Sequence, residues 1–152
     1  MKERGLKYLG YDIVMQEVPN EISLAINISG CQHRCKGCHS EYLWDYKGNY
    51  IKDDIQNIIS EYDGLITCVC FMGCDENIVQ LQSLIMYVKS IGLKTCLYSG
   101  EDDISKLSCL FEYCDYIKFG RYIEELSTDD NIQYGIKLAT SNQRIYKRGK
   151  DY

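Results

Sequence analysis

The sequence predicts an α/β fold, an incomplete parallel β/α barrel formed as a single domain over residues 1–152. Two patterns indicate it: apolar strand-like runs alternate with amphipathic helix-like segments, and glycines mark the joints between them. Strands that alternate with helices at this pitch form βαβ units around a parallel sheet, and their crossovers are right-handed. A full eight-stranded barrel takes about 250 residues. A chain of 152 residues therefore leaves the barrel open.

The first strand of this pattern is expected at 22–28, where apolar side chains occupy alternate positions. The only proline, Pro19, is expected in a turn just before it. The strand leads directly into Gly30 and a loop rich in cysteine. A β/α barrel carries its active site on the loops at the carboxyl ends of its strands, so this loop is the first place to look for chemistry.

The elements after the loop follow from the spacing of apolar residues. Asp53 is expected to cap a helix with the apolar face Ile55, Ile58, Ile59 and Tyr62, ended by Gly64. The apolar run 65–72 is typical of a central parallel strand covered on both faces. The remaining expected elements are a helix over 78–91 ended by Gly92, a strand over 93–98, a helix with the stripe Ile104, Leu107, Leu110 and Phe111, a strand over 115–119, and short strands over 136–138 and 142–146.

Three cysteines of the loop, Cys31, Cys35 and Cys38, are separated by three and by two residues. This spacing lets three sulfur atoms converge on one centre. Cubane iron–sulfur clusters are ordinarily held by four cysteine thiolates. A cluster held by three would leave one iron without a protein ligand, and open metal sites are the catalytic ones.

Other readings of the cysteines remain open at this point. Together with His39, the three could form a Cys3His zinc site. Cys68, Cys70 and Cys74 could form a second ligand set, although small buried hydrophobic residues are the more usual role for cysteines outside a motif. A disulfide framework is disfavoured because the count of nine cysteines is odd and cytosolic thiols stay reduced.

Composition excludes several classes of function. The net charge of −5 gives no basic face for nucleic acid. The N-terminal residues are charged and lack the apolar core of a signal peptide. The longest apolar run, 65–72, is far shorter than the roughly 20 residues of a spanning helix. We therefore expect a cytoplasmic protein that binds neither nucleic acid nor membrane.

The cysteine motif, with Gly37 just before Cys38, resembles that of the radical S-adenosylmethionine (SAM) superfamily. Within it the chain is most similar to the activating proteins of anaerobic ribonucleoside-triphosphate reductases, which the stretches 120–122 and 141–144 also resemble. The resemblance implies a radical SAM type of open barrel. It also implies a [4Fe–4S] cluster held by Cys31, Cys35 and Cys38 as the catalytic group, with SAM as the second cofactor.

The resemblance also implies a set of SAM contacts. Gly73, Cys74 and Asp75 lie where the superfamily has a Gly-Gly-Glu or Gly-Gly-Asp stretch that holds the methionine amino group, with Cys74 in place of the second glycine. Ser99 lies in a stretch that resembles the family's Tyr-Thr-Gly, and His39 follows Cys38 where an aromatic residue near the adenine is common. These five residues are the candidate cofactor-binding residues.

The implied activity is that of a radical SAM oxidoreductase: reductive cleavage of SAM generates a glycyl radical on the large subunit of an anaerobic ribonucleotide reductase. The implied partners are that subunit and a low-potential electron donor such as flavodoxin or ferredoxin, and a homodimer is left open. Two alternatives remain: an activase of another glycyl radical enzyme, such as pyruvate formate-lyase, and a small zinc-binding interaction module.

Overall fold

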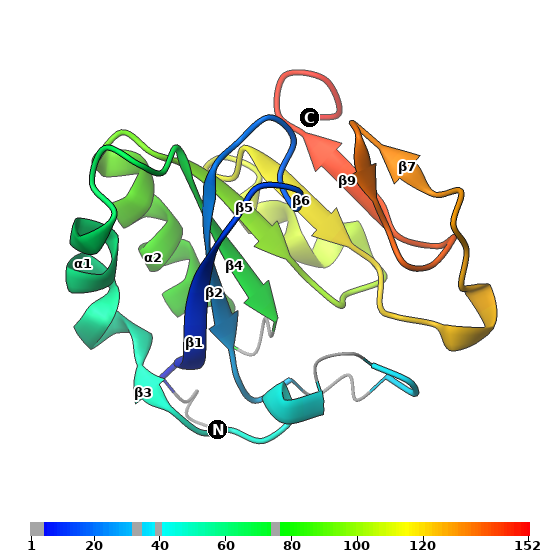
Figure 1. Ribbon diagram of the computed structural model, residues 1–152, viewed down its shortest axis with the longest axis horizontal. Coiled ribbons are helices and arrows are strands. Elements are labelled where there is room, and N and C mark those ends of the chain that lie inside the picture. Colours follow the sequence, from blue (N-terminus) through cyan, green and yellow to red (C-terminus); the bar gives the residue numbers. More distant parts are fainter. Residues whose placement is uncertain (1–4, 32–34, 39–40, 74–76) are drawn as a thin grey trace.

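The computed structural model describes residues 5–31, 35–38, 41–73 and 77–152. Its main feature is a seven-stranded sheet in the order β3-β1-β2-β4-β5-β6-β9 (Figure 1). The strands are β1 (Lys7–Val14), β2 (Ser23–Ile28), β3 (Asn49–Tyr50), β4 (Cys68–Gly73), β5 (Lys94–Tyr98), β6 (Tyr116–Phe119) and β9 (Arg144–Lys147). A second, two-stranded sheet pairs β7 (Ile132–Gln133) with β8 (Ile136–Lys137).

The centre of the large sheet is parallel, and its edges are antiparallel. β2, β4, β5 and β6 are parallel neighbours, whereas β1 pairs antiparallel with β2 and β9 antiparallel with β6. The central strands are the four that the sequence predicts, with ends that differ by a few residues. The fold is therefore mixed α/β. The barrel form stays a prediction.

Two α-helices, α1 (Ile51–Glu61) and α2 (Ile78–Ser90), cover one face of the sheet (Figure 1). Alternate residues of the central strands pack against them in one continuous core, which includes Leu24, Ile26, Ile28, Val69, Phe71, Ile55, Ile58, Leu81, Ile85 and Val88. This core is the burial that the period-two and 3–4 patterns predict. Neither helix is long and apolar enough to cross a bilayer, within the part of the chain that the structure describes.

The expected cap of the first helix is wrong. The N-cap residue of α1 is Tyr50, which makes no side-chain capping bond, and Asp53 lies inside the first turn with Asp54. Carboxylates in a first turn still favour the helix because they oppose the positive end of its dipole. Asp54 also accepts a hydrogen bond of 2.7 Å from the hydroxyl of Tyr8, which links α1 to β1.

The segment after β5 also differs from expectation, because it forms the 3-10 helix η2 (Ile104–Leu110) rather than an α-helix. Ile104, Leu107 and Leu110 are spaced by three throughout, which places them on one face of a helix with three residues per turn. Leu107 and Leu110 are buried, as expected. The remaining short helices are η1 (Glu41–Leu43) and η3 (Glu124–Leu126).

The opposite face of the sheet carries buried thiols. Cys68, Cys70 and Cys96 pack in a second cluster with Val18, Tyr116, Ile136, Leu138 and Ile145. Burial raises the pKa of the Cys68 and Cys96 thiols, which keeps them protonated. The expected role of small buried hydrophobic residues holds for these three and for Cys114, whereas Cys109 is exposed.

Candidate metal centre

The cysteine loop leaves the sheet at the carboxyl end of β2 and is fixed at its start by backbone hydrogen bonds. The amides of Gly30 and Cys31 both donate to the carbonyl oxygen of Leu43, at 2.8 and 3.0 Å. Leu43 is buried and belongs to η1, so the far end of the loop packs back onto its beginning. Cys31 is thereby held at the edge of the hydrophobic core.

The second half of the motif is a tight turn. The amide of Cys38 donates to the carbonyl oxygen of Cys35 at 3.1 Å. Gly37 has a φ of +75°, which is the conformation that glycine supplies at the third position of a type II turn. A Cβ atom on Gly37 would lie 3.1 Å from the Glu124 carboxyl carbon and 3.3 Å from the Tyr122 ring. The turn therefore packs tightly against the chain that follows β6.

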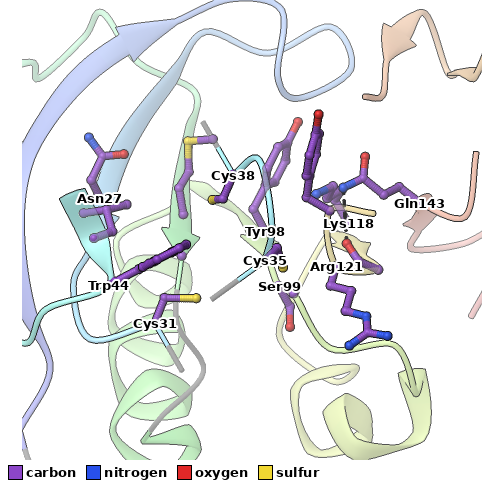
Figure 2. Close-up of a pocket in the computed structure, with 16 residues that line it drawn as sticks. Asn27, Cys31, Cys35, Cys38, Trp44, Tyr98, Ser99, Lys118, Arg121 and Gln143 are labelled. Carbon is purple, nitrogen blue, oxygen red and sulfur yellow. Dashed lines mark hydrogen bonds between the residues drawn. The ribbon is translucent and has the colours of Figure 1, made fainter. Parts of the chain in front are cut away.

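The three cysteines line one cavity of about 190 Å3 at the carboxyl ends of the parallel strands. Figure 2 shows Cys31 beside Trp44 on one side of it and Tyr98 with Lys118 on the other. Of the cysteines that the structure describes, Cys31, Cys35 and Cys38 are the ones that line this cavity. All three are partly exposed, as ligands to an incoming centre must be.

The sheet supplies the floor of the cavity through one row of neighbouring side chains. Asn27, Met72, Tyr98 and Lys118 are register partners on β2, β4, β5 and β6, and all four line the cavity. Successive residues of a strand point to opposite faces. The row thus lies opposite the helix-covered face, where Ile26, Phe71 and Ile117 are buried.

Lys118 is the functional candidate that sequence reasoning missed. Its ammonium lies 5.3 Å from the centroid of the Tyr98 ring. Desolvation in the cavity lowers the pKa of Lys118 to about 8, partly offset by the nearby Cys35, Cys70, Cys96 and Cys38 thiols. The signal in the sequence was a lysine in the otherwise buried strand 115–119, since buried charges are retained where they have a partner or a task.

The predicted SAM contacts have different outcomes. Gly73 and Ser99 both line the cavity; Gly73 is the last residue of β4, and Ser99 directly follows β5. The Ser99 side chain is only 2% exposed, and its hydroxyl accepts a hydrogen bond of 3.0 Å from the amide of Glu101. His39, Cys74 and Asp75 lie outside the described residues. Gly73 and Ser99 are therefore the two predicted contacts that the structure brings to the cysteines.

A second, larger cavity adjoins the first on the same face of the sheet. It has a volume of about 820 Å3 and is lined by residues 15–17, 19 and 20 and by residues 134–139, which include β8. The two cavities share the lining residues Cys38, Tyr98, Lys118, Tyr122 and Gln143. The space beside the cysteines thus continues into a wider opening, which is within the range of small-molecule and cofactor sites.

The donor set fits an iron–sulfur cluster. Thiolate sulfur is the ligand of such clusters, and three thiols face one cavity here. In the described residues no three His, Cys, Asp or Glu side chains are already gathered closely enough to hold a single metal ion. The finding includes Cys31, Cys35 and Cys38, which line one cavity without converging on one point. The second candidate set, Cys68, Cys70 and Cys74, stays a prediction because Cys74 lies outside the described residues.

Comparison with known proteins identifies the kind of centre. The family model described as a 4Fe-4S single cluster domain matches residues 22–146, which include all three loop cysteines. Searches of curated proteins and of solved structures returned no match. The matched range begins just before β2 and ends within β9, so it covers the parallel sheet and both walls of the cavity. The chain belongs to the 4Fe-4S single cluster domain family, and a 4Fe–4S cluster is its indicated cofactor.

Proposed function

We propose that this protein is a radical SAM activating enzyme that generates a glycyl radical on an anaerobic ribonucleoside-triphosphate reductase. The observation that carries the proposal is the set of three cysteines, Cys31, Cys35 and Cys38, on one cavity at the carboxyl ends of a parallel sheet. A cubane cluster held by three protein thiolates keeps one iron open. That iron would bind the amino and carboxylate groups of SAM.

The cluster, when reduced, supplies the single electron that cleaves the sulfonium of SAM. The protein supplies binding, orientation and electrostatics, as in cofactor enzymes generally. Under this proposal Cys31, Cys35 and Cys38 hold the cluster. The row Asn27, Met72, Tyr98 and Lys118 forms the floor on which SAM rests.

Lys118 gives the cavity the positive charge that an amino acid carboxylate needs. The cost of desolvating its ammonium is what lowers the pKa of Lys118 to about 8. A hydrogen bond to a bound carboxylate would offset this desolvation free energy, because a charge-assisted hydrogen bond is strong in a site of low dielectric. Lys118 therefore favours a ligand with an acidic group over a purely apolar one.

Gly73 borders the cavity beside the cysteines. It has a φ of +124° and is the last residue of β4, at the edge where the cavity opens. Trp44 closes the cavity on the side of Cys31 (Figure 2). We propose that the incomplete β/α barrel keeps the opposite side, the larger cavity near the β7–β8 hairpin, open to a protein substrate.

The test uses protein prepared without air and carrying a full cluster. After reduction with dithionite, addition of SAM is expected to yield methionine and 5′-deoxyadenosine. Addition of the reductase large subunit is then expected to give a doublet from a glycyl radical in electron paramagnetic resonance (EPR) spectra. A fully loaded, reduced protein that leaves SAM intact would refute the proposal.

The same assay separates the two alternatives. A radical on pyruvate formate-lyase, with none on the reductase, would assign the protein to that other class of activase. Protein that takes up one zinc per chain and no sulfide would be a zinc-binding module. The 4Fe-4S single cluster family match argues for iron and sulfide.

A further inference from the structure

Binding of a cluster by the three cysteines assigns no role to the stretch 141–144. Two side chains of this stretch form hydrogen bonds to the backbone that follows β6. The Gln143 side chain is 4% exposed; its Oε1 accepts from the amides of Ala139 and Thr140 at 3.1 and 3.2 Å. Its Nε2 donates to the carbonyl oxygen of Gly120 at 3.3 Å. We call Asn142 and Gln143 the clasp.

The Asn142 side chain binds the residue that follows Gly120 in the same backbone segment. Its Nδ2 donates to the carbonyl oxygen of Arg121 at 3.0 Å, and its Oδ1 accepts from the hydroxyl of Thr140 at 2.7 Å. Two successive carbonyl oxygens, those of Gly120 and Arg121, are thus bound by two successive side chains. An amide side chain suits this task because it donates and accepts at once.

Gly120 is shaped to receive the clasp. It has a φ of +103°, and a Cβ atom there would lie 3.1 Å from the Cα of Gln143 and 3.2 Å from the carbonyl oxygen of Asn142. Its own amide donates to the carbonyl oxygen of Glu101 at 2.8 Å. The backbone after β6 is therefore held between the loop after β5 and the clasp.

The clasped residues form the cavity wall that faces the cysteine turn. Gly120, Arg121 and Tyr122 line the cavity. The Tyr122 ring packs against Gly37, which lies between Cys35 and Cys38. Contact therefore runs from the clasp through this wall to the turn that carries two of the three thiols.

We propose that Asn142 and Gln143 are positioning residues, which hold the wall 120–122 against the turn 35–38 and so fix where Cys35 and Cys38 meet the cluster. The role of these residues rests on the proposed function, whereas their hydrogen bonds do not depend on it. The clasp acts through Gly120, Arg121 and Tyr122 and takes no part in electron or hydrogen transfer.

The chain offers matched control variants. Asn131 donates to the carbonyl oxygens of Thr140 and Gln143 at 2.8 and 2.9 Å. Gln133 donates to the carbonyl oxygen of Gln143 at 3.0 Å and accepts from the amide of Ile145 at 2.8 Å. Both hold the same tail by the same kind of bond, and neither side chain has a hydrogen bond to residues 120–122 among those described.

The experiment measures thiol alkylation rates in the reduced protein without cluster, resolved by peptide mass spectrometry, with exposed Cys109 as internal reference. Asn142→Ala and Gln143→Ala are expected to raise the rates at Cys35 and Cys38 about fivefold by favouring local opening. Asn131→Ala and Gln133→Ala are expected to leave them within about twofold. Equal acceleration in all four variants, or none in the clasp variants, would overturn the proposal. If Gln143→Ala does not fold, Asn142→Ala decides.

A second measurement ties the clasp to SAM. SAM is titrated into the reduced, cluster-loaded protein, and the change in the EPR signal of the cluster is followed. Asn142→Ala is expected to raise the SAM concentration at the midpoint of this change about fivefold, with iron content unchanged. A normal SAM response in Asn142→Ala would contradict the positioning role. If the wild-type protein shows no SAM response at all, the proposed function fails, and the alkylation rates still decide whether the clasp exists.

Discussion

A Cβ atom on Gly73 would lie 2.5 Å from the carbonyl oxygen of Ile28, at the point where β4 and β2 end side by side. Real Cβ atoms do not approach an oxygen so closely, so the position accepts glycine alone. Ile28 leads into the cysteine loop, and Gly73 lines the cavity beside it. The two backbones therefore meet beside the cavity.

We therefore predict that Gly73→Ala lowers the free energy of unfolding by about 2–4 kcal/mol, through backbone strain and displacement of β2. Gly92→Ala is the matched control, because Gly92 also has a positive φ, +87°, but open space around it. That variant is expected to cost only about 1 kcal/mol. Urea denaturation of the protein without cluster measures both. Equal losses would contradict the close approach at Ile28.

The second prediction concerns the cluster ligands. Cys35→Ser is expected to reduce the iron and sulfide content from about four of each per chain to a small remainder. Cys109→Ser should keep the full content, because Cys109 is exposed and does not line the cavity. Chemical analysis after anaerobic reconstitution measures both. Full iron content in Cys35→Ser would remove Cys35 from the ligand set.

The third prediction concerns Cys74, which follows Gly73 directly in the sequence. Our proposal requires an iron without a fourth protein thiolate, so Cys74→Ser is expected to keep both its cluster and its cleavage of SAM. A variant that loses the cluster would instead identify Cys74 as the fourth ligand. The cluster would then be closed, and closed centres serve electron transfer or structure.

The fourth prediction concerns Lys118. Lys118→Met removes a desolvated charge, so the free energy of unfolding is expected to stay equal or to rise, while SAM binding weakens about tenfold or more. Lys137→Met is the control, because Lys137 lies at the second cavity but has a side chain 61% exposed and paired with Asp129. Equilibrium binding of SAM to the loaded protein measures the difference. Unchanged affinity in Lys118→Met would exclude a carboxylate partner.

The fifth prediction is a pH dependence of stability. Burial raises the pKa of the Cys114 thiol from its ordinary value of 9.0 to about 12. The folded state thus keeps a proton that the unfolded state loses, so stability is full below pH 9 and falls as pH rises toward 12. The loss from this thiol is about 1.4 kcal/mol at pH 10.

Chemical denaturation at pH 8, 9 and 10, with a reductant present, tests this prediction. Cys114→Ala is expected to be less stable at every pH but to show a shallower decline, whereas Cys109→Ser should decline as the wild-type protein does. The buried Cys68 and Cys96 thiols contribute in the same direction, since the pKa of each is also raised. A decline that is identical in all three proteins would rule out Cys114 as a contributor.

Much of the fold was open to prediction because it depends on local periodicity. The alternating residues of 22–28 and the 3–4 stripe of 78–91 both became the expected element. The stripe buries one face of α2, whereas β2 is buried on both of its faces. The stripe at Ile104, Leu107 and Leu110 was ambiguous, because a spacing of three fits both helix types. Strand β1 escaped prediction because most of its residues are half-buried and show no alternation.

The residues of the candidate site also fall into those that the sequence predicts and those that it does not. Cys31, Cys35 and Cys38 are recognisable because a ligand loop is a local motif whose spacing is written in the sequence. Lys118 and Gln143 lie more than eighty residues after Cys35. Their place at the cavity depends on which strands become neighbours, which no local pattern states.

The sequence alone thus predicted the alternation of strands and helices and the three candidate sulfur ligands, since both follow from spacing along the chain. Tertiary structure decided which side chains meet those sulfurs. The parallel order β2-β4-β5-β6 brings Lys118 to the floor of the cavity, and the antiparallel pairing of β9 with β6 brings Gln143 to Gly120. The physical reason is that hydrogen bonding between strands joins residues far apart in sequence, whereas hydrophobic periodicity acts within one element.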